Sequence, residues 1–228
     1  MEVSPCTQFV DIGVNVGQTM VEILALYPEL EYHGFEPNIE ALCCTQAVAN
    51  SHGFIASLYP WACASEAAPQ NFFAESNLDT SASMISSIRP DTYADIRAQA
   101  IAAYPFDQVF FHKAKYGFVM KIDVEGGENE VLMGAQKLLM HRRPLIMCEV
   151  LNAHRESEVD MNNLRKAKLE RLLSEADYQI QQIVLNPRDR EAFLGLKPVD
   201  AFPRNLLWRD SSHQCDYIFI PDEISLKC

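Results

Sequence analysis

The sequence predicts an α/β fold, in which a mostly parallel β-sheet carries helices on both faces. Two observations lead to this prediction: short apolar segments typical of strands alternate with segments of helical periodicity, and glycines and acids gather where two of the strands end. Strands that alternate with helices in this way form parallel sheets. The 228 residues, of which 48% are hydrophobic and 22% charged, suit a single domain over 1–228 with a substantial core.

The first half of the chain shows the alternation clearly. A short apolar strand is predicted at 8–12, and apolar residues within 20–27 then recur at the spacing of one helix face. A second strand is predicted at 31–37, and Asn38 after it is a residue type that caps helix N-termini. A third strand is predicted at 54–62.

The rest of the chain is irregular at first and regular later. Between 64 and 117 the patterns predict a short strand at 70–74, a Ser-rich loop at 76–88 that could close over a ligand, an alanine-rich helix at 93–104 and a strand at 106–111. Further on they predict strands at 118–124, 144–150, 178–185 and 216–221, with helices over 125–143 and 169–176. No helix separates the last two strands, so we expect them to pair as an antiparallel hairpin at one edge of the sheet.

Charge and cysteine content narrow the expected partners and compartment. With 31 acidic and 19 basic residues the net charge is −12, whereas proteins that bind nucleic acids usually carry a basic face. Seven cysteines without a CxxC pair predict reduced thiols. The N-terminus has no signal-peptide pattern, and no segment approaches the roughly 20 apolar residues of a membrane-spanning helix. We therefore expect a soluble cytoplasmic protein with no nucleic-acid partner and no membrane insertion, and the sequence predicts no oligomeric state.

The stretch "DIGVNVGQ" at 11–18 follows the first predicted strand and has the character of a ligand-binding turn. Gly13 permits a positive φ angle, and Asn15 is the non-glycine residue that tolerates one best. Gly17 would let the start of the following helix lie close to a ligand. In open parallel sheets, ligands bind at the carboxyl ends of the strands.

Three ligands compete for this turn. A phosphate-binding loop needs Gly-Lys-Ser/Thr, which is missing, and a dinucleotide fingerprint needs a third glycine in the register G-x-G-x-x-G. Asp11 would also repel a pyrophosphate. A cationic nucleoside fits better, and S-adenosylmethionine is one: Asp11 would attract its ammonium group, and the two oxygens of Glu36 would accept its ribose hydroxyls.

A second unusual stretch is "KIDVEGGENEVLMGA" at 121–135, which crowds Lys121, Asp123, Glu125 and Glu128 around a Gly-Gly turn. Carboxylates so dense at the end of a strand are costly unless a cationic group meets them. Their oxygens suit Mg²⁺, but nothing else in the sequence completes a coordination shell, and no zinc pattern exists. We therefore expect no metal ion.

These stretches, together with "GFEP" at 34–37 and "RPLIMCEV" at 143–150, resemble the FkbM family of S-adenosylmethionine-dependent methyltransferases in order and spacing. The resemblance implies a Rossmann-like class I methyltransferase fold with seven strands, the last of them antiparallel. It implies that the methionine part of the cofactor is held by Asp11, Gly13, Asn15 and Gly17, the ribose by Glu36, and the adenine by the segment at Trp61 and Ala62. It also implies that Asp123 and Glu125 line the place where the donor methyl faces its acceptor.

The acceptor is the less defined half of the prediction. Family members mostly methylate hydroxyl groups of saccharides or natural products, so the resemblance implies an O-methyltransferase with a small-molecule or saccharide acceptor. A hydroxyl must lose its proton, and the candidate bases are Asp123, Glu149 and His154. The segments 66–117 and 186–215 have the position of insertions that cover the substrate. An NAD-dependent Rossmann oxidoreductase and a non-catalytic binding protein on the same fold stay open as alternatives.

Overall fold

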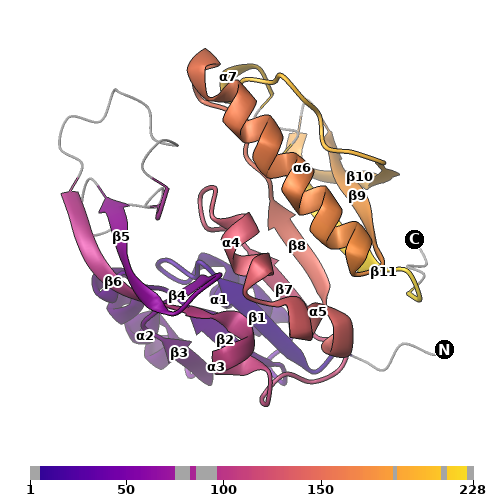
Figure 1. Cartoon of the computed structure of the whole chain (residues 1–228). Coiled ribbons are helices and arrows are strands. Elements are labelled where there is room, and N and C mark those ends of the chain that lie inside the picture. The colour runs from indigo at the N-terminus through magenta and orange to yellow at the C-terminus, as the bar shows by residue number, and fades with distance from the viewer. Residues whose placement is uncertain (1–5, 75–82, 86–96, 187–188, 212–214, 225–228) are drawn as a thin grey trace.

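The computed structural model describes residues 6–74, 83–85, 97–186, 189–211 and 215–224. Its main sheet has eight strands in the order β10-β9-β11-β8-β7-β1-β2-β3 (Figure 1). Five neighbouring strands are parallel, namely β3 (Ala56–Tyr59), β2 (Glu31–Phe35), β1 (Gln8–Ile12), β7 (Val119–Ile122) and β8 (Leu145–Glu149). The strand order reverses at β1, between β2 on one side and β7 on the other. Such a switch point is where open α/β sheets bind their ligands.

Helices cover both faces of the main sheet, as the alternation predicted. One face carries α1 (Gln18–Leu26) and α2 (Ile39–His52), and the other carries α4 (Glu128–Met133), α5 (Gln136–Arg142) and α6 (Val159–Glu175) (Figure 1). Side chains of β1 alternate between the two cores, so that Phe9 packs with α1 and α2 and Val10 packs on the opposite face. The predicted cap is present: Asn38 Oδ1 accepts hydrogen bonds from the backbone of Glu40 (3.1 Å) and Ala41 (3.4 Å).

The antiparallel strands lie differently from the prediction. β11 (Asp216–Pro221) is antiparallel to β9 (Tyr178–Asn186), as expected, but it also pairs with β8 and therefore lies inside the sheet. The edge is formed by β10 (Asp189–Pro198), an eighth strand from within the predicted insertion. The prediction of a hairpin at the edge was wrong because sequence patterns identify strands and not their order in the sheet.

A second sheet of three strands stands beside the main one and consists of β4 (Ala62–Ala64), β5 (Ala68–Ala74) and β6 (Arg97–Pro105) (Figure 1). The single strand predicted at 54–62 is therefore two strands in two sheets, with Pro60 and Trp61 between them. Proline lacks the N–H that would continue the ladder, so the chain leaves the main sheet there.

Two predictions in the middle of the chain were reversed. Residues 97–105 form strand β6 and not a helix: alanine has a high helix propensity, but such propensities are small in energy, and pairing with β4 and β5 outweighs them. Residues 106–110 form helix α3 (Phe106–Phe110) and not a strand; Phe106 and Phe110, four apart, are both buried and stack at 5.0 Å.

The helix predicted over 125–143 is also divided, into α4 and α5. Asp107 of α3 explains the division, because its carboxylate accepts hydrogen bonds from the backbone of Lys137 (2.8 Å) and Leu138 (2.9 Å) and so caps α5. A short 3-10 turn, η2 (Glu156–Glu158), precedes α6, and α7 (Trp208–Ser211) precedes β11.

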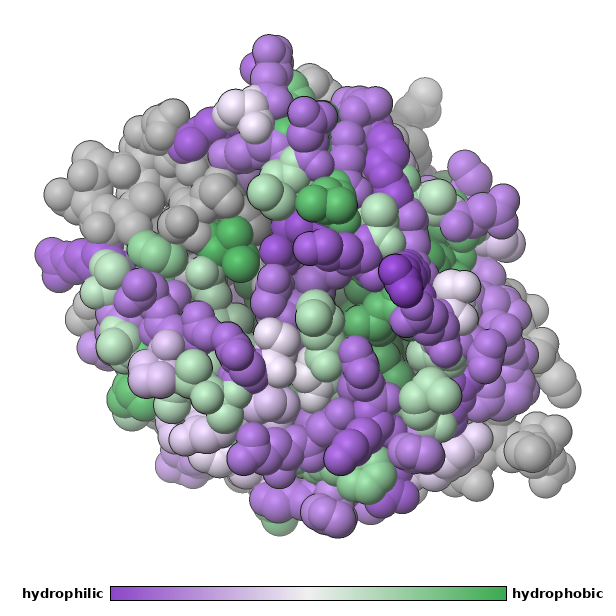
Figure 2. Space-filling model, viewed as in Figure 1, coloured by the Kyte–Doolittle hydropathy of each residue, from purple (hydrophilic) through white to green (hydrophobic). Residues whose placement is uncertain are grey.

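The surface seen in Figure 2 is mostly hydrophilic, with hydrophobic residues in small separate groups. Among the described residues, no helix is long and apolar enough to span a bilayer. The loop predicted at 76–88 lies outside the described residues except for 83–85. Met84 and Ile85 of this short piece line the cavities that are described below.

Candidate active site

A cavity of about 270 Å³ opens at the carboxyl end of β1, at the switch point of the sheet. Its walls come from four places: the turn after β1, the segment 35–38 after β2, the segment 61–63, and the end of β7 at 121–125. Met84 also contributes to the wall. The stretches that the sequence singled out are thus brought together around one space, which we call the cofactor cavity.

The turn after β1 is shaped by two glycines, and packing against neighbouring elements requires both of them. Gly13 has φ 91°, and a Cβ at this position would lie 1.9 Å from the carbonyl oxygen of Asp123. Gly17 is not part of the cavity wall; a Cβ there would lie 2.9 Å from Thr45 of α2. The glycines therefore let the turn pack against β7 and α2. Gln18 and Thr19, at the start of α1, line the cavity, and the role of Gly17 in bringing the helix close to a ligand stays a prediction.

Glu36 projects into the cavity with only 5% of its surface exposed. Its Oε2 accepts a hydrogen bond from the backbone of Asn15 (3.0 Å), and its Oε1 accepts one from Asn38 (2.8 Å). Burial raises the pKa of Glu36 to about 7, although the two backbone N–H groups oppose this. Each oxygen keeps a second lone pair, so the carboxylate can still accept two ligand hydroxyls.

Two buried polar atoms on the cavity wall lack a hydrogen-bond partner within the described part of the chain. They are Oδ1 of Asn15 and the indole Nε1 of Trp61. Buried polar groups are normally satisfied, so these two atoms are candidates for hydrogen bonds to a bound ligand. Ala62, beside Trp61 on the wall, leaves the space next to the indole open.

Asp11 is fully buried (0% exposed) and lies behind the cavity wall. Its Oδ2 accepts a hydrogen bond from the hydroxyl of Tyr32 (2.6 Å), and its Oδ1 lies 3.5 Å from Nζ of Lys121. Lys121 also donates to Asp123 (2.9 Å). Burial lowers the pKa of Lys121, but Asp11 and Asp123 outweigh this and raise it. The expected direct contact of Asp11 with an ammonium group does not fit this position, and Asp11 instead fixes Lys121 and through it Asp123.

Asp123, Glu125 and Glu149 form an acidic cluster where β7 and β8 end, with carboxylate oxygens that all lie within 4.8 Å of one another. Burial, and then repulsion from Asp123, Glu125 and Asp216, raise the pKa of Glu149 to about 8. These oxygens could hold a hard divalent cation, and Glu149 takes the place that was predicted for Glu128. The absence of a metal stays a prediction.

His154 and Glu128 lie apart from this cluster, on a second cavity between α4 and α6. The imidazole of His154 stacks on Trp208 (5.7 Å between ring centres), and burial lowers its pKa. Among the lining residues that sequence reasoning did not single out are Met84 in the cofactor cavity and Lys166 in the second cavity. Lys166 left a signal, because a lysine three residues before Leu169 and seven before Leu173 lies on an otherwise apolar helix face.

The strand order and the position of the cavity define a class of protein: a Rossmann-like class I methyltransferase fold with an additional edge strand. The methyltransferase FkbM domain model matches residues 11–180. The chain belongs to the FkbM methyltransferase family.

One solved structure supports this fold. A methyltransferase FkbM from Methylobacillus flagellatus KT aligns with 96% of this chain at 16% identity and a TM-score of 0.56. The alignment covers 44% of that protein, so this chain spans less than half its length. A precorrin-6y C5,15-methyltransferase from Geobacter metallireducens GS-15 aligns with 96% of this chain and 81% of its own, at 11% identity and a TM-score of 0.44. The sequence matches none of the curated proteins with which it was compared.

Proposed function

We propose that this protein is an S-adenosylmethionine-dependent methyltransferase that methylates a hydroxyl oxygen of a saccharide or natural product. The observation that carries the proposal is the set of unsatisfied groups in the cofactor cavity. Asn15 Oδ1 lacks a hydrogen-bond donor and Trp61 Nε1 lacks an acceptor, while the buried carboxylate of Glu36 can accept hydrogen bonds from two hydroxyl groups. A nucleoside with an ammonium-bearing tail offers all of these partners. A pyrophosphate would instead be repelled by the carboxylates of Glu36 and the acidic cluster.

In this proposal each wall of the cavity has one task. Glu36 holds the ribose, Trp61 and Ala62 flank the adenine, and Asn15 accepts a hydrogen bond from the methionine part. Gly13 and Gly17 shape the turn, and Asp11 acts indirectly through Lys121. When bound, S-adenosylmethionine supplies a methyl group on a sulfonium centre. Alignment of donor and acceptor by the surrounding side chains can be worth roughly 7–11 kcal/mol of the barrier.

The acidic cluster supplies the base. A hydroxyl that attacks a methyl group must give up its proton, and a carboxyl group with a pKa near the working pH is well suited to accept it. Glu149, with its pKa raised to about 8, has that property. It lines a neighbouring cavity with Asp216 and Tyr217, and Asp123, which is oriented by Lys121 and lines the cofactor cavity, connects it to the site. His154 faces the second cavity and belongs to the acceptor side of this proposal.

Calorimetric titration with S-adenosylhomocysteine, the product left after methyl transfer, tests the proposal. We expect binding with a dissociation constant in the micromolar range, and a thermal shift on binding. NADH should give neither heat nor a change in its fluorescence, and an NADH response would favour the oxidoreductase. Tight cofactor binding combined with full biological function in Asp123→Asn would favour a non-catalytic protein. The cytoplasmic location and the covering role of 66–117 and 186–215 stay predictions.

Binding of S-adenosylhomocysteine is expected to strengthen as the pH rises from 6 to 8. Ribose hydroxyls donate hydrogen bonds to the ionised form of Glu36, and the pKa of about 7 means that this form is scarce at pH 6. The dissociation constant should fall roughly tenfold over this range, with protons released on binding. Calorimetry in buffers of different ionisation enthalpy measures both.

Glu36→Gln should bind more weakly and without this pH dependence. Glu40→Gln is the matched control, because Glu40 is exposed on the first turn of α2 and should behave as the wild type. A pH profile that Glu36→Gln leaves intact would show that another group causes it.

A further inference from the structure

A second cavity of about 370 Å³ lies directly beside the cofactor cavity, between α4, α6 and the segment that follows β8; we call it the α6 cavity. Neighbouring residues line the two spaces: Met84 faces the cofactor cavity and Ile85 the α6 cavity, and Glu125 faces the first and Gly126 the second. Ser83 Oγ donates a hydrogen bond to the carbonyl of Glu125 (2.6 Å), which joins these two boundary segments. A molecule in the α6 cavity therefore lies across a thin boundary from the cofactor site.

The wall of the α6 cavity combines an apolar part with polar groups around it. The apolar part comes from Ile85, Val150, Leu151, Ala153, Met161 and Leu169, and the polar groups include Asn129, His154, Ser157 and Asn162 beside the charged residues. Apolar walls with a few placed polar groups are typical of small-molecule sites. A saccharide carries hydroxyls all round its ring, and those that face the apolar part of this wall would lack hydrogen-bond partners.

Lys166 is the exceptional group in this wall. It is only 3% exposed, and its Nζ donates hydrogen bonds to the side-chain oxygen of Asn152 and to the carbonyl of Pro203 (2.9 Å). Both acceptors are neutral, and no carboxylate of the described residues lies within ion-pair distance of Nζ. Buried charges are normally paired with an opposite charge. The ammonium group of Lys166 is an exception, because only neutral oxygens accept its hydrogen bonds.

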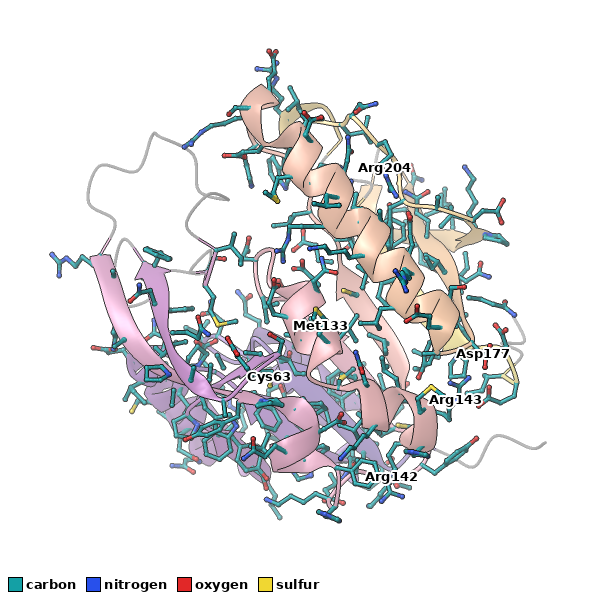
Figure 3. All side chains as sticks on the ribbon, in the orientation of Figure 1. Cys63, Met133, Arg142, Arg143, Asp177 and Arg204 are labelled. Carbon is teal, nitrogen blue, oxygen red and sulfur yellow. The ribbon has the colours of Figure 1, made fainter. Side chains whose placement is uncertain are left out.

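The carboxylate that should pair with Lys166 is engaged elsewhere. Glu170, one helical turn further along α6, binds Arg204 with one oxygen (2.5 Å) and the backbone N–H of Phe202 with the other (2.6 Å). Figure 3 shows Arg204 on the loop beside α6. The neighbouring cation, Arg165, has its own partner in Glu130 (2.5 Å).

The two acidic residues that line the α6 cavity, Glu128 and Glu158, interact with groups other than Lys166. Glu128 accepts a hydrogen bond from the backbone of Gly126 (2.8 Å), at the boundary with the cofactor cavity; burial raises its pKa to about 7, although backbone N–H groups and the charge of Arg165 oppose this. Glu158 lies 3.5 Å from Arg155. The region around Lys166 is thus the part of the cavity where a negative charge is missing.

We propose that the α6 cavity binds the methyl acceptor, and that this acceptor has an apolar body and a carboxylate group that pairs with Lys166. This rests on the proposed function for the role of acceptor, but the binding chemistry is independent of it. The acceptor hydroxyl would then lie toward Gly126 and Ile85, where the two cavities adjoin.

The test uses three probes on the full chain: 3-(4-hydroxyphenyl)propionate, its neutral amide, and methyl glucoside. Ligand-observed NMR and calorimetry measure their affinities with and without saturating S-adenosylhomocysteine. We expect the carboxylate to bind roughly tenfold or more tightly than the amide, as a charge-assisted contact requires, and the glucoside not to bind. Lys166→Met should bind both phenyl probes equally, and Lys166→Gln serves as a second variant if the first does not fold.

Lys168→Met is the matched control, because Lys168 is exposed on the same helix and should keep the preference for the carboxylate. Equal affinity of carboxylate and amide in the wild type, no binding of the carboxylate at millimolar concentration, or a preference that survives in both Lys166 variants would each overturn the proposal. Tight binding of the glucoside would restore a saccharide as the acceptor. Failure of S-adenosylhomocysteine to bind, with the carboxylate preference present, would instead refute the proposed function alone.

Discussion

Glu149→Gln is expected to lower kcat roughly 10²–10⁴-fold, because the variant loses the group that accepts the proton of the acceptor hydroxyl. In the wild type, kcat should rise as the pH passes through about 8, since only the ionised carboxylate can accept a proton. The variant should lose this rise, while its affinity for S-adenosylhomocysteine stays close to that of the wild type. Steady-state rates from pH 6 to 10, with any acceptor that is turned over, measure both effects.

Asp216→Asn provides the control for this assignment. Asp216 contributes to the raised pKa of Glu149, after burial and the charges of Asp123 and Glu125. Its neutralisation should shift the rise in kcat to lower pH and leave the maximum rate nearly unchanged. A profile that stays in place in Asp216→Asn, or a Glu149→Gln enzyme that keeps its activity while Asp123→Asn loses it, would assign the base to Asp123.

The elements around the cofactor cavity were predictable because local patterns determine them. The strand at 8–12, the turn to Gly17 and the strand ending before Glu36 form consecutive βα units, in which hydrophobic period and turn residues agree. The same consistency placed Asp123 and Glu125 at the end of β7, next to that turn. The sequence therefore predicted that the turn after β1, Glu36 and the end of β7 meet at the switch point, whereas Asp11 and Gly17 lie outside the cavity wall.

The other features of the fold and the site could not be predicted, because they depend on contacts between segments that are distant in the sequence. Strand β6 exists because β4 and β5 pair with it, and the capping of α5 by Asp107 of α3 divides a helix that periodicity joined. The burial of Asp11 behind Lys121 follows from the position of Tyr32 on the neighbouring strand, which no motif encodes. Likewise, the isolation of Lys166 is visible only when Glu170 is seen to bind Arg204.

Gly13→Ala is expected to have the largest effect on folding of any single methyl group added to the site. At φ 91° the alanine would be strained, and its Cβ would lie 1.9 Å from the carbonyl oxygen of Asp123, an atom of the backbone that cannot rotate away. Left-handed backbone costs about 1–2 kcal/mol, and forced separation of packed strands about 1–3 kcal/mol or more. Against a typical total stability of about 5–15 kcal/mol, the melting temperature should fall by roughly 10 °C or more.

Gly117→Ala separates the cost of backbone strain from the cost of the clash with Asp123. Gly117 also has a positive φ angle (68°), but a Cβ there would meet nothing within 4 Å, so this variant shows backbone strain without the clash. Its melting temperature should fall by only a few degrees, since about 1–2 kcal/mol is lost. The Gly13 variant should in addition bind S-adenosylhomocysteine more weakly, because displacement of β1 from β7 moves Asn15 away from Glu36. Equal melting temperatures for the two variants would show that β7 can yield at Asp123, and that Gly13 is needed only for its backbone conformation.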